Sequence, residues 1–141
     1  MKKKGWIIAG ALALCIVLGI VLGVVCWQNR YKLNADEIDR ISLLPDPFTA
    51  SVNLEAEDAE RFIELFNAAK YAGEANGEGT TPEWLVRVYC NDGSCYKISD
   101  FSKTSGRIQV SYYDPSGGME AWFYVESLEL MDFVLEMVSK Y

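Results

Sequence analysis

An unbroken apolar segment opens the chain, before any alternating pattern begins. Residues 6–27 read WIIAGALALCIVLGIVLGVVCW and contain no charged side chain. At a rise of roughly 1.5 Å per residue, a helix of this length spans about 33 Å, enough to cross a hydrocarbon core of about 30 Å. Trp6 and Trp27 stand at its ends, where indole rings favour the membrane interface. The pattern therefore predicts a transmembrane helix over residues 6–27.

A cleaved signal peptide is the alternative for this segment. Its apolar region would be about 7–15 residues long and would be followed by a small-x-small cleavage site. Residues 9–11 and 11–13 have that pattern, but they lie near the start of the apolar run. Neither Cys15 nor Cys26 follows a small residue, as it would in a bacterial lipid-anchor signal. We therefore expect an uncleaved anchor.

Beyond residue 36 the chain changes to the alternation of short strands, interrupted by segments with a helical period. Strands are expected over six segments: 38–44, 49–54, 83–90, 95–99, 107–113 and 119–126. Helices are expected at 56–70 and 128–140, the second capped by Ser127, and residues 71–82 have a loop composition. The fold class predicted is α+β: a two-layer domain with an antiparallel sheet of about 4–6 strands and two helices on one face.

Charge gives the expected orientation. Five of the 13 Lys and Arg residues lie before residue 33, and all 20 Asp and Glu residues lie after it, which leaves −12 on the remainder. The basic N-terminal residues predict a short cytoplasmic tail, 1–5, by the positive-inside rule. A tether, 28–36, then leads to an extracytoplasmic domain, 37–141, on the outer side of the cell membrane.

The turn "NDGS", Asn91 to Ser94, lies between two predicted strands. With the strand and helix layout, it makes residues 37–141 resemble the small membrane-tethered extracytoplasmic domains of Gram-positive bacterial proteins. The resemblance implies an α+β module attached to a single-pass anchor. It implies no catalytic motif.

The same turn separates Cys90 from Cys95, and the strand register decides whether they can bond. A loop of Asn91, Asp92 and a left-handed Gly93 would pair Val88 with Tyr96 and Val86 with Ile98, which keeps the apolar residues on one face. Cys90 and Cys95 would then point to opposite faces, which disulfide geometry does not allow. We expect free thiols; a bond is the alternative, because oxidation could select the other register.

Composition excludes several kinds of chemistry. The chain has no histidine, so there is no Ser-His-Asp or Cys-His couple and no histidine-ligated metal. Two thiols around a turn do not make a zinc site or a redox-active C-x-x-C. The acidic domain lacks the basic patch that nucleic acid requires. No cofactor, metal site or catalytic residue is therefore predicted.

A stripe of small residues runs along the predicted membrane helix. It is formed by Ala11, Cys15, Gly19 and Gly23, spaced every four residues. Such stripes let two helix backbones approach closely in lipid, which predicts a homo-oligomer or a second membrane protein as partner. A plain anchor is the alternative, since glycine and alanine are common in such helices.

The strand alternation leaves a second set of side chains facing away from the apolar core. Its aromatic and arginine members are Arg87, Tyr89, Tyr113, Trp122 and Tyr124. Aromatic and arginine side chains are the usual energetic anchors of interfaces, so these residues are a candidate partner-binding face. Cross-strand aromatic pairing that only stabilises an exposed sheet is the alternative. In that case the loop 71–82 is the next place to look for a binding site.

These observations predict a membrane-anchored interaction module that binds a protein, peptide or envelope component and is not an enzyme. The alternative is a carboxylate-dependent envelope glycan hydrolase, because the domain is rich in Asp and Glu. Such an enzyme needs two carboxylates about 5–10 Å apart in a cleft.

Overall fold

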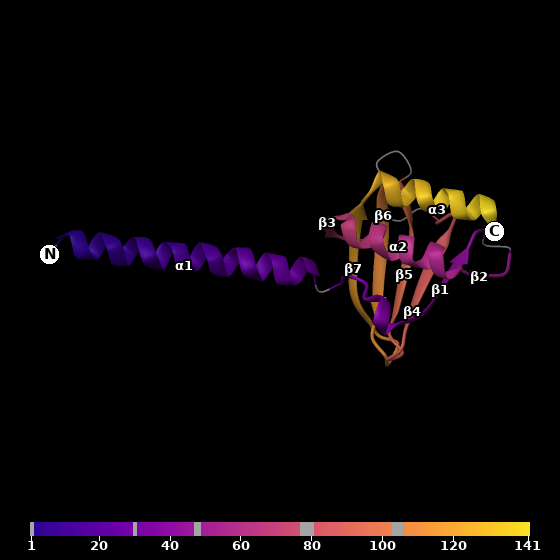
Figure 1. Ribbon diagram of the computed structural model, residues 1–141, viewed down its shortest axis with the longest axis horizontal. Helices are drawn as coiled ribbons and strands as arrows, with labels where there is room; N and C mark the ends of the chain where they lie inside the picture. Colours follow the sequence, from indigo (N-terminus) through magenta and orange to yellow (C-terminus); the bar gives the residue numbers. More distant parts are fainter. Residues whose placement is uncertain (1, 30, 47–48, 77–80, 103–105) are drawn as a thin grey trace. The chain divides into compact units, whose positions relative to one another are not determined.

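The computed structural model describes the chain except for residues 1, 30, 47–48, 77–80 and 103–105. The chain divides into two compact units, Met1–Lys32 and Leu33–Tyr141 (Figure 1). The division falls inside the predicted tether, and each unit is described by itself below.

The first unit is a single helix, α1, which spans Lys2–Asn29. Within it, the segment Lys2–Cys26 is long and apolar enough to cross a membrane. The residues of this segment are exposed. The predicted helix, 6–27, therefore lies inside a longer one that takes in the flanking lysines.

The second unit begins earlier than expected, because Leu33 already belongs to it. The Leu33 side chain is 5% exposed, and its backbone is held by Asn67 of helix α2 (Ala56–Ala68). The Leu33 N–H donates to Asn67 Oδ1 at 2.7 Å, and Asn67 Nδ2 donates to the Leu33 carbonyl at 2.8 Å. A short 3-10 helix, η1 (Ala35–Glu37), follows. Of the predicted tether 28–36, only residues 30–32 lie between α1 and this attachment.

The sheet has seven strands rather than the predicted 4–6, and all pairs are antiparallel. Its order is β2-β1-β4-β5-β6-β7-β3. The bounds are β1 Ile38–Leu44, β2 Val52–Asn53, β3 Lys70–Glu74, β4 Leu85–Cys90, β5 Cys95–Ser102, β6 Arg107–Tyr113 and β7 Met119–Glu126.

The prediction missed β3, which it assigned to the end of a helix and the start of a loop. This edge strand pairs with β7 alone and carries an irregularity between Tyr71 and Glu74. Gly73, inside that irregularity, has φ +105°, a conformation that glycine adopts without strain. A short, bulged strand with one neighbour has no clear alternation, so its sequence resembles a loop.

The core lies between the sheet and two amphipathic helices. Helix α2 buries Phe62, Leu65 and Phe66. Helix α3 (Leu128–Lys140) buries Leu130, Met131, Val134 and Met137. The helices contact each other, α3 contacts β6, and Figure 1 shows both helices in front of the strands. Ser127 caps α3 as predicted, since its Oγ accepts the Leu130 N–H at 3.0 Å.

Fully buried strand residues line up across the sheet. Val86 is paired with Leu43 on one side and with Ile98 on the other, and Ile98 is paired with Val110. All four are at most 1% exposed. Burying one such side chain contributes about 1.5–3 kcal/mol, so this row is a major part of the stabilisation. The residues between these positions must face the opposite side of the sheet.

The hairpin between β4 and β5 confirms the predicted register. Val86 is paired with Ile98 and Val88 with Tyr96. The Cys90 N–H donates to the Ser94 carbonyl at 3.0 Å, and Gly93 has φ +91°. Burial of the apolar residues on one face therefore sets the pairing, and a three-residue loop accommodates it.

Candidate partner-binding face

Four of the five candidate residues lie in two rows across the sheet, which we call the second face; Tyr124 is in neither row. The first row is Ser42, Arg87, Lys97, Ser111 and Trp122, and the second is Arg40, Tyr89, Cys95 and Tyr113. Neighbours within each row are directly opposite in the strand register. The register thus brings Arg87 and Trp122 into one row and Tyr89 and Tyr113 into the other.

Arg87 and Lys97 are directly opposite each other, so two positive side chains are neighbours on β4 and β5. Within the described part of the chain, neither forms an ion pair with a carboxylate. Lys97 Nζ lies 4.4 Å from the centroid of the Tyr113 ring. The Arg87 Nε atom is buried and has no hydrogen-bond partner.

The aromatic members of the second row also lie close to cations. The Arg40 guanidinium lies 4.0 Å from the centroid of the Tyr89 ring, and it pairs with Asp39 at 2.7 Å. Tyr89 and Tyr113 are both half-buried, so part of each ring remains accessible. A cation over a ring is worth about 0.5–1 kcal/mol at an exposed site, which helps to hold these side chains in place.

Trp122 ends the first row on β7. Its ring is half-buried, and its Nε1 atom is buried without an acceptor. Its backbone is held by the residue that follows β3, since the Ala75 N–H donates to the Trp122 carbonyl at 3.0 Å. A buried indole N–H normally has a hydrogen-bond acceptor, so a buried donor without one is unusual.

Tyr124 does not belong to an accessible surface, which corrects the prediction. Only 5% of it is exposed. The centroid of its ring lies 4.6 Å from the centroid of the Phe101 ring, and its hydroxyl donates to Asn76 Oδ1 at 3.3 Å. The prediction ended the strand of Phe101 at residue 99, whereas β5 continues to Ser102. The covering ring was therefore assigned to no element.

Cys90 and Cys95 are both free in the structure. Cys95 is opposite Tyr89, and Cys90 is the next residue after Tyr89, so the two thiols are assigned to opposite faces of the sheet. Burial raises the pKa of both thiols, although Lys97 and Arg87 partly offset this rise at Cys95. Their redox state stays a prediction.

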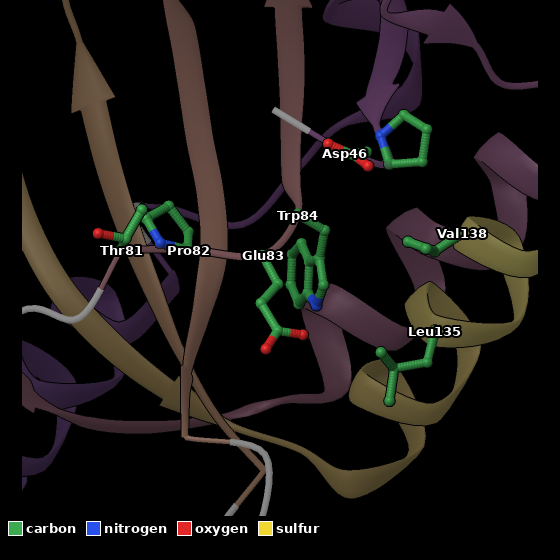
Figure 2. A pocket seen from close by; sticks show the side chains of 8 residues that line it. Asp46, Thr81, Pro82, Glu83, Trp84, Leu135 and Val138 are labelled. Carbon is green, nitrogen blue, oxygen red and sulfur yellow. The ribbon is translucent and has the colours of Figure 1, made fainter. Parts of the chain in front are cut away.

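A cavity of about 450 Å³ lies elsewhere in the domain and was not predicted (Figure 2). Three separate segments form it: the end of β1, the approach to β4 and helix α3. Its lining residues are Pro45, Asp46, Thr81, Pro82, Glu83, Trp84, Leu135 and Val138. Figure 2 shows the Asp46 and Glu83 carboxylates on opposite sides of the Trp84 ring, so they do not face each other.

The small-residue stripe is confined to the first unit. Ala11, Cys15, Gly19 and Gly23 all belong to α1 and are exposed. A Cβ added at Gly19 or Gly23 would meet no atom within 4 Å. The stripe remains a prediction about association. Among the described residues, no group of three or more His, Cys, Asp or Glu side chains could hold a metal ion.

Comparison with known proteins gives no match: no family model, curated protein or solved structure resembles the chain closely enough to be reported.

Proposed function

We propose that the chain is a single-pass membrane protein whose second unit binds a protein partner outside the cytoplasm, without catalysis. The proposal is carried by one observation, the second face. Half-buried aromatic rings, Tyr89, Tyr113 and Trp122, are interleaved there with the cations Arg87 and Lys97. Of these, tyrosine, tryptophan and arginine are the residue types that dominate the binding energy of interfaces.

The expected orientation supports the same proposal. The lysines at the N-terminal end of α1 favour a cytoplasmic N-terminus, which leaves the acidic unit outside.

A photo-crosslinking experiment tests the face in the full-length protein within its membrane. A photoreactive amino acid replaces Tyr113 on the second face, or Asp132 on the exposed side of α3 as the matched control. We expect a defined adduct from position 113, its loss on Trp122→Ala, and no adduct from position 132. Adducts of equal yield from both positions would contradict the proposal.

Folding must be measured beside capture, because Trp122 could be structural. We expect Trp122→Ala to keep most of the melting temperature of the domain, as the ring is only half-buried. Leu128→Ala, which removes an exposed apolar side chain from α3, is the control for nonspecific loss of surface area. A Trp122→Ala protein that unfolds would support the alternative, a sheet that is merely stabilised by aromatic pairs.

Carboxylate-dependent glycan hydrolysis is the second candidate, since Asp46 and Glu83 line the same cavity. A glycosidase pair must flank the scissile bond from about 5–10 Å apart. The Trp84 ring lies between the two carboxylates in Figure 2, which favours binding over hydrolysis. The test is whether the protein releases reducing ends from cell-wall glycan. Release that is abolished by Asp46→Asn and also by Glu83→Gln would make hydrolysis, rather than binding, the favoured function.

A further inference from the structure

We propose that the second face takes a peptide segment bearing carboxylates, and that Arg87 and Lys97 are the residues that contact them. This inference rests on the proposed function and gives it a partner chemistry. It is argued from the charges and the unpaired donors of a single row of the sheet.

Arg87 and Lys97 are a pair of cations without carboxylate partners among the described residues. Like charges directly opposite on neighbouring strands destabilise a sheet. Four other cations of the unit have carboxylate partners, among them Arg107, which pairs with Glu126 at 3.0 Å, and Lys140, which pairs with Asp58 at 2.7 Å. Lys70 has none among the described residues, but it is exposed at the start of the edge strand β3. Arg87 and Lys97 have no such partner among the described residues, although the unit carries an excess of acidic side chains. A carboxylate supplied from outside would neutralise this pair.

Two of the three buried side-chain donors that lack an acceptor in the described part of the chain lie in one row of the second face; the third is Trp84 Nε1. Arg87 Nε and Trp122 Nε1 are both buried and unpartnered, and both belong to the row that contains Lys97. A buried donor without an acceptor costs stability that an arriving acceptor restores. Guanidinium groups bind carboxylates through paired N–H bonds, so a carboxylate suits Arg87 in particular.

The distribution of cations favours a peptide over a polyanion. A polyphosphate or nucleic acid needs an extended basic patch. In the two rows only Arg87 and Lys97 are cations without a carboxylate partner, since Arg40 pairs with Asp39, and the unit as a whole is acidic. The flanking side chains are rings, those of Tyr89, Tyr113 and Trp122, which suit apolar neighbours of an acidic residue. A peptide with isolated carboxylates between apolar side chains matches both features.

The experiment uses the full-length protein in a non-ionic detergent and measures binding by calorimetry at low salt. The probe is the capped peptide Ac-Phe-Glu-Gly-Glu-Phe-NH2, whose alternate residues put both carboxylates on one side when it is extended. The control is the same peptide with Gln in place of Glu. We expect the Gln peptide to bind about tenfold more weakly, because it lacks the charge-assisted hydrogen bonds. Equal binding of the two peptides would overturn the proposal.

Lys97→Gln tests the residue assignment. The substitution should weaken binding of the Glu peptide about tenfold. It should also keep or raise the melting temperature of the protein, because it removes the repulsion between Lys97 and Arg87. Arg61→Gln is the matched control, since Arg61 is an exposed cation of α2 that pairs with Glu64. Unchanged binding in Lys97→Gln, or an equal loss in Arg61→Gln, would overturn the assignment.

Two further outcomes separate this inference from the proposed function. If Trp122→Ala abolishes crosslinking while Lys97→Gln leaves it intact, the face binds its partner without this charge pair, and the inference fails alone. If neither change affects crosslinking, both the proposed function and this inference fail.

Competition with inorganic phosphate tests the class of ligand. If phosphate displaces the Glu peptide when both supply the same concentration of negative charge, the ligand is a phosphate compound and the peptide proposal is overturned.

Discussion

Tyr89 lies directly opposite Cys95 across the β4–β5 hairpin, which places the neighbouring Cys90 on the other side of the sheet. The pairing follows from burial, because Val86 and Val88 share a face only in this register. A disulfide between the two cysteines would have to cross the sheet plane, against the geometry of the bond.

We therefore expect Cys90 and Cys95 to be free thiols even in an oxidising environment. Alkylation of the unfolded protein without reductant, followed by mass spectrometry, should find both residues modified. In the folded protein alkylation should be slow at neutral pH and faster as pH rises, since burial raises the pKa of each thiol and less thiolate is present. A peptide in which residues 90 and 95 are joined would contradict the register argument.

Asp58 ties helix α2 to the C-terminus. Its Oδ2 accepts from Lys140 Nζ at 2.7 Å and from the Tyr141 hydroxyl at 2.9 Å, and the hydrogen bond from Lys140 is the main reason that the pKa of Asp58 lies below its usual 3.8. Because the folded pKa is lowered, this stabilisation is present above pH 3.8 and is lost as pH falls through the folded value.

Asp58→Asn should therefore lower the melting temperature by a few degrees at neutral pH. It should also flatten the decline in stability below pH 4, because the titrating group is gone. Thermal unfolding at several pH values checks both. Glu57→Gln, at the neighbouring exposed position of α2, is the control and should change little. An identical acid profile for Asp58→Asn and the natural chain would contradict this account.

Gly106 should be far less tolerant of alanine than Gly117. Both have positive φ, +62° and +90°, so both incur backbone strain of about 1–3 kcal/mol when a Cβ is added. At Gly106 that Cβ would also lie 2.9 Å from Leu128 Cδ2 and 3.0 Å from the Leu128 nitrogen, at the start of α3. At Gly117 it would meet nothing within 4 Å.

We expect Gly117→Ala to cost about 1 kcal/mol and Gly106→Ala about 3 kcal/mol or more, since overpacking adds to the strain. Chemical denaturation of the two variants measures the difference directly. An equal loss in the free energy of unfolding for the two variants would mean that the start of α3 moves aside without any cost in stability.

The small-residue stripe predicts association of α1 in lipid. Replacing Gly19 and Gly23 with Leu should abolish dimer crosslinking or partner recovery in membranes, because a bulky side chain keeps the backbones apart. Val17→Leu with Val21→Leu is the matched control, as these residues have the same spacing outside the stripe. Association that survives the glycine replacements would leave α1 as a plain anchor.

Long, regular patterns were predictable, and features made by distant segments were not. The alternation around Val86 and Val88 was enough to predict the hairpin register, because one face of that hairpin is fully buried. Tyr124 was misplaced because Phe101, which covers it, lies beyond the last clear alternation of its strand. The cavity beside Trp84 brings together residues 45–46, residues 81–84, and Leu135 and Val138, which no local pattern connects.

Both outer edges of the sheet are poor templates for another strand. One edge is β2, only Val52–Asn53, and the other is β3, which is irregular near Gly73 and begins and ends with the charged residues Lys70 and Glu74. Short, bulged or charged edges resist pairing with a second chain. Strand addition is thus disfavoured at either edge, and we expect any partner of this unit to be held by side chains rather than by backbone hydrogen bonds.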